Sequence, residues 1–126
     1  MITNSSDNRQ RPTTPAVVRS VSRAGSTARI HLTGEVDMST AEQVGKAVAE
    51  ALNRADTTAP ISRIELDLSA VTFLDSSGIR ELLEVQANAA ERGCRLVVRG
   101  THGTVARVLE ISGVTALLAG TIAEAD

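Results

Sequence analysis

Apolar and polar residues alternate over residues 28–33, which is the pattern of a half-buried β-strand. The apolar positions would face a core, and the polar positions, among them His31, would face the solvent. A valine-rich stretch over residues 16–22 predicts another strand just before this one, and residues 23–26 have the composition of a turn. The pattern therefore predicts an antiparallel hairpin near the start of the chain.

Apolar residues then recur at spacings of three and four over residues 41–52, which predicts an amphipathic helix. Residues 39–42 (STAE) match a capping box, in which a serine and a glutamate each satisfy a free backbone N–H. We expect the helix to start there and to end near Arg54. Alternation returns over residues 61–68 and predicts a strand that ends at Leu68.

The rest of the chain continues the succession of helices and strands. A helix is predicted from about residue 76 to residue 92, and Gly93 is a typical residue past a helix end. Residues 94–98 predict a short buried strand. Another helix follows, with Thr101 as its candidate cap, and residues 115–118 predict a last edge strand.

Strands that alternate with helices pair mostly in parallel, through right-handed crossovers. We therefore expect an α/β fold: a single domain with a mixed, mostly parallel sheet of four or five strands, an N-terminal antiparallel hairpin and three or four helices. Residues 16–120 are expected to form this domain. Residues 1–15 are polar and predict a flexible arm, and residues 121–126 are expected to form a short tail.

Composition excludes several classes of protein. The net charge is −2 and only 1% of the residues are aromatic, so the chain lacks the basic, aromatic surface of a nucleic-acid interface. The single cysteine, Cys94, excludes a disulfide framework and a cysteine-based zinc site. No apolar run reaches membrane-spanning length, and no nucleotide-binding glycine motif is present. We expect a cytoplasmic protein with no cofactor, no nucleic-acid partner and no membrane partner.

Loops that follow parallel strands gather at one end of a sheet, where open α/β sheets place their sites. Asp37 comes after the second predicted strand, and Asp75 and Ser76 come after the third. His102 follows the fourth. These four side chains are therefore expected to lie near one another.

The segment around Asp75 has the composition of a helix start. Asp75 is a good N-cap, which would place Ser76 and Ser77 at the first two helical positions. Gly78 in the first turn costs about 1 kcal/mol relative to alanine, so another backbone or surface is expected to approach closely there. Phe73, the only aromatic residue, is expected in the connection before the helix rather than in a strand.

A serine at a helix start suits phosphorylation, because free N–H groups and the helix dipole tolerate a phosphate. The modification would add a charge of about −1.5 to −2 at neutral pH. A partner fitted to the neutral hydroxyl of Ser76 would then have to desolvate that charge beside Asp75. Since burying an unpaired ion costs several kcal/mol, one phosphate would end docking without unfolding the domain.

Three runs of sequence resemble, in the correct order, the STAS-domain anti-sigma factor antagonists: residues 32–37 (LTGEVD), 64–79 (IELDLSAVTFLDSSGI) and 109–114 (LEISGV). The resemblance covers residues 17–118. In that family the serine directly after the aspartate, here Ser76, is phosphorylated by the anti-sigma factor, which is a serine kinase. The resemblance implies that the unphosphorylated form binds this kinase and releases the sigma factor, and that a serine phosphatase resets the switch.

The same resemblance implies a bacterial phosphoprotein that regulates transcription by partner switching, for example in a stress response. It implies a binding module rather than an enzyme, present as a monomer or weak dimer. Ser77 is a second candidate for the modified residue. The docking set implied for this chain is Asp37, Asp75, Ser76, Ser77, Gly78 and Ile79.

Three other interpretations stay open. A hydrolase with Ser76 as nucleophile and His102 as base would lack the Gly-x-Ser-x-Gly turn that usually presents such a serine. Asp37 and Asp75 as a metal pair have no supporting histidine cluster. The third alternative is a STAS regulatory or scaffold subunit of a stress-signalling complex or of a lipid or anion transport complex.

Overall fold

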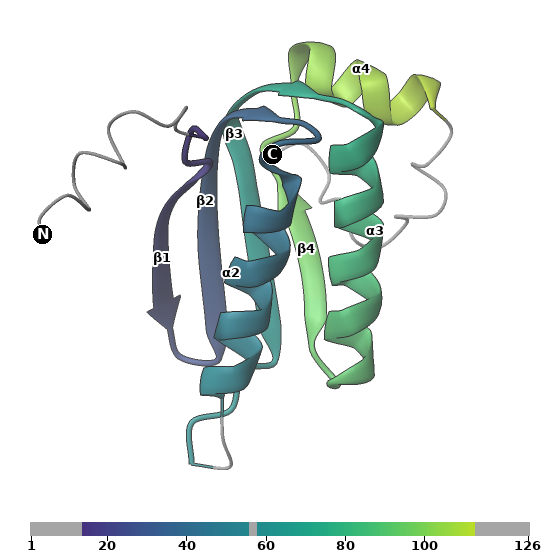
Figure 1. The fold of residues 1–126 in the computed structure, drawn as a ribbon. Coiled ribbons are helices and arrows are strands. Elements are labelled where there is room, and N and C mark those ends of the chain that lie inside the picture. Colours follow the sequence, from purple (N-terminus) through teal and green to yellow (C-terminus); the bar gives the residue numbers. More distant parts are fainter. Residues whose placement is uncertain (1–13, 56–57, 113–126) are drawn as a thin grey trace, which may run out of the picture.

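The computed structural model describes residues 14–55 and 58–112, which form one four-stranded sheet and three helices (Figure 1). The elements are, in chain order, β1 (Val18–Ala24), β2 (Thr27–Val36), α2 (Ala41–Arg54), β3 (Arg63–Leu74), α3 (Ser76–Glu91), β4 (Arg95–Arg99) and α4 (Gly103–Ile111).

The strands lie in the order β1-β2-β3-β4, with β1 antiparallel to β2 and the other neighbours parallel. This order confirms the predicted α/β class, the hairpin and the mostly parallel sheet. The strand predicted over residues 115–118 and the tail over residues 121–126 lie outside the described residues, as does most of the arm over residues 1–15.

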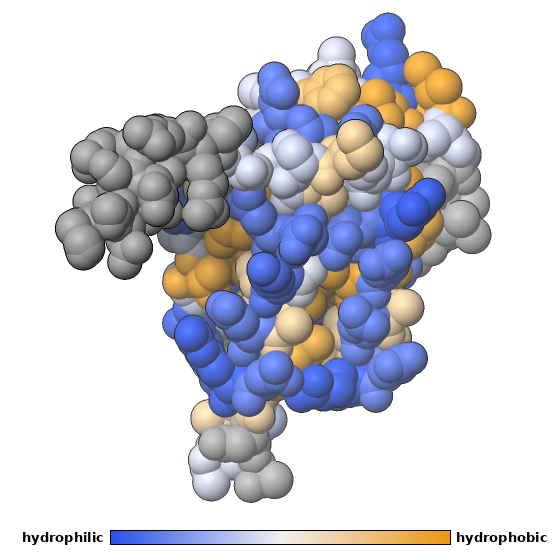
Figure 2. Space-filling model, in the orientation of Figure 1, coloured by the Kyte–Doolittle hydropathy of each residue, from blue (hydrophilic) through white to orange (hydrophobic). Residues whose placement is uncertain are grey.

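Helices α2 and α3 lie side by side over one face of the sheet (Figure 1). Each connects two parallel neighbours, and crossovers of the same hand place both helices on the same face. The core beneath them is aliphatic, and Ile30, Leu66 and Val98 at its centre are fully buried. The outer surface of the two helices is mostly hydrophilic (Figure 2). None of the described helices is long and apolar enough to cross a membrane.

Strand β3 is longer than the alternation of its residues predicts. The predicted end at Leu68 is wrong, because the strand continues to Leu74 and contains Phe73, which was expected in a connection. The buried positions here are Leu68, Val71 and Leu74, three residues apart instead of two. The pairing register with β2 shifts by one residue twice over this part of β3. Each shift is a β-bulge with an extra residue in β3, so the strand persists although its alternation is lost.

The capping box predicted for α2 is not formed. The helix begins at Ala41 with Thr40 at the N-cap position, and Ser39 lies before both. The backbone N–H and the hydroxyl of Ser39 donate to Oδ1 of Asp37, at 2.9 and 2.8 Å. Because the turn uses the hydroxyl of Ser39, this hydroxyl is not available to the helix.

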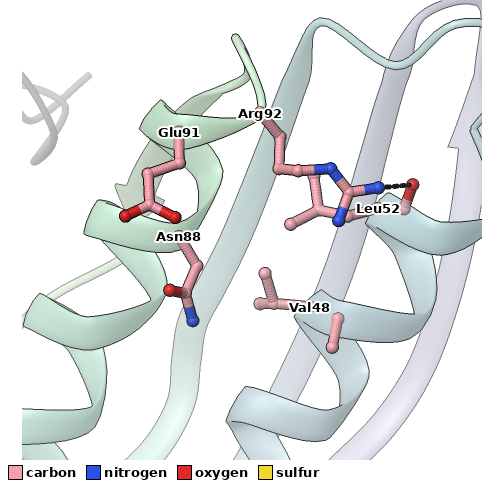
Figure 3. A pocket seen from close by; sticks show the side chains of 6 residues that line it. Val48, Leu52, Asn88, Glu91 and Arg92 are labelled. Atoms are coloured by element: carbon pink, nitrogen blue, oxygen red, sulfur yellow. Dashed lines mark hydrogen bonds between the residues drawn. The ribbon is translucent and has the colours of Figure 1, made fainter.

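Arg92 joins the C-terminal ends of the two packed helices (Figure 3). Its guanidinium donates to the carbonyl oxygen of Leu52 at 3.0 Å and to Oδ1 of Asn53 at 3.4 Å. The last carbonyl groups of a helix have no partner within the helix, so this contact satisfies one of them. Arg92 also lines a groove of about 160 Å³ between α2 and α3. We therefore assign this groove to helix packing.

Candidate functional site: the corner at the start of α3

Helix α3 begins at Ser76 because Asp75 caps it. Oδ1 of Asp75 accepts the backbone N–H groups of Ser77 at 2.9 Å and of Gly78 at 3.1 Å. These are two of the N–H groups that a helix start leaves without partners, and the carboxylate also lies favourably at the positive end of the helix dipole. The predicted N-cap and the predicted helix start are both confirmed.

Asp37 and Asp75 lie at the same end of the sheet. Each directly follows a strand, and the last residues of those strands, Val36 and Leu74, are paired with each other. The backbone N–H of Asp75 donates to the carbonyl oxygen of Val36 at 3.3 Å. The carboxylate of Asp37 is held within its own turn, where hydrogen bonds from Ser39, chiefly from its hydroxyl, lower the pKa of Asp37. The structure thus brings the two strand ends together, with a carboxylate on each.

The residues after Asp75 differ in their access to solvent. Ser76 is exposed and Ser77 is partly exposed. Gly78 is buried, and Ile79 is only 8% exposed and belongs to the core. The hydroxyl of Ser76 is therefore open to a partner, whereas Gly78 and Ile79 hold the start of α3 against the sheet.

The close approach predicted at Gly78 comes from the side chain of Leu74 at the end of β3 and from the backbone of β2. A Cβ atom at this position would lie 2.8 Å from the carbonyl oxygen of Val36 and 3.1 Å from its Cγ1. Real Cβ atoms essentially never lie within 3.0 Å of a backbone oxygen. Glycine therefore allows α3 to start this close to the end of β2.

Replacing Gly78 by alanine is expected to destabilise the protein by about 1–2 kcal/mol, because the added methyl group must displace backbone. Alanine is the better helix former, so helix propensity alone would predict that this substitution stabilises the protein. Urea unfolding of both variants measures the effect. Gly45→Ala is the matched control, since a Cβ there would meet only the end of the flexible Glu81 side chain. A Gly78→Ala protein as stable as the parent would contradict the close approach.

His102 does not join this corner. Its Nε2 lies 2.8 Å from the carbonyl oxygen of Ser69, and it occupies the N-cap position of α4 that was expected for Thr101. Strand β4 pairs only with the first part of β3, so the loop after β4 ends beside Ser69. From Ser69 to Leu74, the extended strand rises roughly 16 Å. The prediction that His102 lies with Ser76 is wrong, and the serine and histidine of the hydrolase interpretation are not brought together.

Two exposed apolar side chains lie at the same end of the sheet as this corner. Met38, in the turn after β2, is 85% exposed, and Phe73, next to the end of β3, is 46% exposed. Exposed large apolar side chains that gather in one place mark interaction surfaces. Met38 was not among the predicted site residues, although an apolar residue between the polar turn residues Asp37 and Ser39 was a usable signal.

The described residues contain no group of three or more histidine, cysteine, aspartate or glutamate side chains that could hold a metal ion. Cys94 is buried, and this burial raises the pKa of its thiol, which disfavours the reactive thiolate form. What the corner offers is a solvent-facing hydroxyl on a capped helix, with two exposed apolar side chains at the same end of the sheet.

Comparison with known proteins places this architecture in a family. Residues 20–119 match the family model described as "Mlab, STAS domain". Because this match covers most of the chain, the protein belongs to the STAS domain family.

Solved structures share the fold over most of the chain. An anti-sigma factor antagonist from Mycobacterium paratuberculosis is 20% identical, with a TM-score of 0.67, and the match covers 83% of each chain. The Bacillus cell fate determinant SpoIIAA in its phosphorylated form is 22% identical, with a TM-score of 0.61, over 85% of this chain and 90% of that one.

Larger proteins carry the same fold as one part. The murine anion transporter Slc26a9 is 16% identical, with a TM-score of 0.67, over 80% of this chain. The present chain spans only 16% of that transporter's chain and 23% of the chain in the crystal structure of Mglu. At identities of 16–22%, the likeness to the transporter and to the two smaller proteins establishes the fold alone. It does not identify the partners of this protein.

Proposed function

We propose that this protein is an anti-sigma factor antagonist. Its unphosphorylated form docks on an anti-sigma factor kinase through the corner around Ser76 and thereby releases the sigma factor. Phosphorylation of Ser76 ends this docking. The observation that carries the proposal is the exposure of Ser76 at the first position of a helix already capped by Asp75. SpoIIAA, which shares the fold, is known in unphosphorylated and phosphorylated forms.

The local hydrogen bonds support a switch by charge. Asp75 already accepts the N–H groups of Ser77 and Gly78, so these donors are not free to neutralise a phosphate on Ser76. The added charge of about −1.5 to −2 would therefore face the partner beside an existing carboxylate. Helix α3 itself keeps its cap, so the modification changes the surface and not the fold.

The exposed apolar residues give the docking surface its proposed anchors. Met38 and Phe73 lie at the same end of the sheet as Ser76, and aromatic and methionine side chains are enriched in the buried centres of interfaces. A kinase surface that covers both side chains would seal the hydroxyl of Ser76 from water. Asp37, Asp75 and Ser77 would line the rim, with Gly78 and Ile79 as support beneath.

The proposal includes the cellular setting. The partners are an anti-sigma factor serine kinase and a serine phosphatase that restores the free hydroxyl, in the cytoplasm. The protein contributes no catalytic step of its own. It acts as a monomer or weak dimer, in transcription regulation such as a stress response.

The test is the site of phosphorylation. Incubation with candidate anti-sigma factor kinases and ATP is expected to place one phosphate on Ser76, located by mass spectrometry of the digested protein. Ser77→Ala is expected to be modified like the parent, because Ser77 is less exposed than Ser76. Ser76→Ala is expected to remain unmodified. Phosphate on Ser77 in the parent would show that Ser77, and not Ser76, is the modified residue. If no such kinase modifies the protein, the proposal is contradicted.

A second candidate function is a regulatory subunit of a lipid or anion transport complex, or of a stress-signalling scaffold. The description of the matching family model and the fold shared with Slc26a9 favour it. Purification of the tagged protein from its source separates the two functions. A small ATP-binding kinase as the bound partner supports the antagonist, and a membrane transport protein supports the alternative.

A further inference from the structure

The face of the sheet opposite α2 and α3 contains a hollow of about 170 Å³. His31 lies at its centre on β2, between Ile30 and Leu32, which are buried beneath the helices. Ser20 of β1 and Asp67 of β3 are the register partners of His31, so all three side chains point to the same face. The hollow is therefore built from three adjacent strands, away from the corner at Ser76.

Irregular pairing on both sides of β2 shapes this hollow. The register of β1 shifts between Val18 and Ser20, which makes Arg19 the extra residue of a bulge. The register of β3 shifts just after Asp67, where Ser69 lies. Bulges turn side chains away from the regular alternation and often occur beside binding sites. Here they bring Arg19 and Ser69 to the rim of the same hollow.

The polar groups of the hollow are mainly hydrogen-bond donors. Arg19 supplies a guanidinium, and Ser20 and Ser69 supply hydroxyls. Asp67 is already engaged, since its Oδ2 lies 3.1 Å from Nδ1 of His31 and its Oδ1 accepts the N–H of Ser69 at 2.9 Å. Because Asp67 holds Nδ1 of His31, the donors that remain for a ligand are the guanidinium of Arg19 and the hydroxyls of Ser20 and Ser69.

The charge of the surrounding face favours an anion. Arg29, Arg63 and Arg99 all approach Glu65 on the same face, between 2.6 and 3.5 Å. Together with Arg19 and Arg95, this face has five arginines against three carboxylates (Glu35, Glu65 and Asp67), in a chain whose net charge is −2. A local surplus of positive charge raises the local concentration of anions.

We propose that this hollow binds the phosphate group of a small molecule. Arg19 and the hydroxyls of Ser20 and Ser69 donate to the phosphate oxygens, and His31, held by Asp67, forms the floor of the hollow between them. The volume is well below the roughly 300–1,000 Å³ of pockets for drug-sized ligands, so the ligand is free phosphate or a small phosphate monoester rather than a nucleotide. The site is separate from the docking corner and does not depend on the proposed function.

Titration of the full chain with inorganic phosphate and, in parallel, with glycerol 3-phosphate tests this site. Amide chemical shifts in NMR spectra are expected to change in a saturable way at Arg19, Ser20, His31 and Ser69. Tighter binding of the monoester identifies a small metabolite as the ligand class, and equal binding identifies free phosphate; either result supports the site.

Arg19→Gln is expected to weaken this binding about tenfold, the effect of losing one hydrogen bond to a charged group. Arg107→Gln is the matched control, because Arg107 is also exposed but lies on α4. Sodium chloride at the same ionic strength controls for screening. Shifts that do not saturate, that sodium chloride reproduces, or that both arginine variants weaken equally would overturn the proposal.

Discussion

Replacing Ser76 by aspartate is expected to weaken docking on the anti-sigma factor kinase by at least about a hundredfold. The hydroxyl of Ser76 is exposed, and Met38 and Phe73 at the same end of the sheet offer apolar surface for the partner to cover. An aspartate there would be buried in the interface with Asp75 as its neighbour. The cost of burying an unpaired ion is several kcal/mol, and each factor of ten in affinity is about 1.4 kcal/mol.

Two variants control for this result, with affinities measured by calorimetry. Ser76→Ala is expected to dock as tightly as the parent, since it keeps the site neutral, but to lose its regulation by ATP. Ser22→Asp adds the same charge at an exposed serine of β1, the strand at one edge of the sheet, and is expected to leave docking unchanged. The switch by charge is ruled out if Ser76→Asp docks as tightly as the parent.

Replacing Glu65 by glutamine is expected to destabilise the fold by about 2–3 kcal/mol. Glu65 is only 5% exposed, and its carboxylate accepts from Arg29 at 2.6 and 2.9 Å and from Arg63 at 2.9 Å. Arg99 lies 3.5 Å away. A neutral side chain would leave these guanidinium groups without the charge that they share. This loss of stability is no larger than the smallest losses typical of a broken buried ion pair. The reason is that the three arginine side chains keep 31–48% of their surface in water.

The same carboxylate predicts a dependence of stability on pH. Burial alone would raise the pKa of Glu65, but the hydrogen bonds and charges of Arg29 and Arg63 outweigh it and hold this pKa below its ordinary value of 4.5. Glu65 therefore contributes its stabilisation above pH 4.5, and loses it as the pH falls through the lower pKa of the folded state.

Urea unfolding of the parent and of Glu65→Gln at neutral pH and in acid measures both effects. The difference between the two proteins is expected to be largest at neutral pH and to shrink below pH 4.5. Glu50→Gln, an exposed position on α2, is expected to change stability by less than about 0.5 kcal/mol. A difference that stays constant into acid would show that the charge of Glu65 is not what stabilises the fold.

Local chemistry was enough to predict the start of α3. The cap at Asp75 and the first helical position of Ser76 both follow from groups within four residues of one another, whereas the need for a small residue at Gly78 comes partly from Val36 on β2. The hairpin and the parallel pairing followed equally well, because alternation and the order of elements leave few arrangements open.

Contacts between distant segments account for the errors. The two bulges in β3 arise from its pairing with β2, and they carry the strand to Leu74, which separates His102 from Ser76. The hydroxyl of Ser39 could cap α2 or bond to Asp37 within the preceding turn. Only the folded geometry shows that it bonds to Asp37. The exposure of Met38 likewise depends on what packs around the turn.

By itself, the sequence determined the order of the elements, the positions of residues 28–33 that face the core and the residue that begins α3, because these depend on periodicity and on hydrogen bonds between near neighbours. Only the tertiary structure decided which strand ends meet, which side chains around Ser76 reach solvent and where polar groups from three strands form a hollow around His31. The physical reason is that register shifts and burial are set by pairing between segments roughly thirty or more residues apart in sequence.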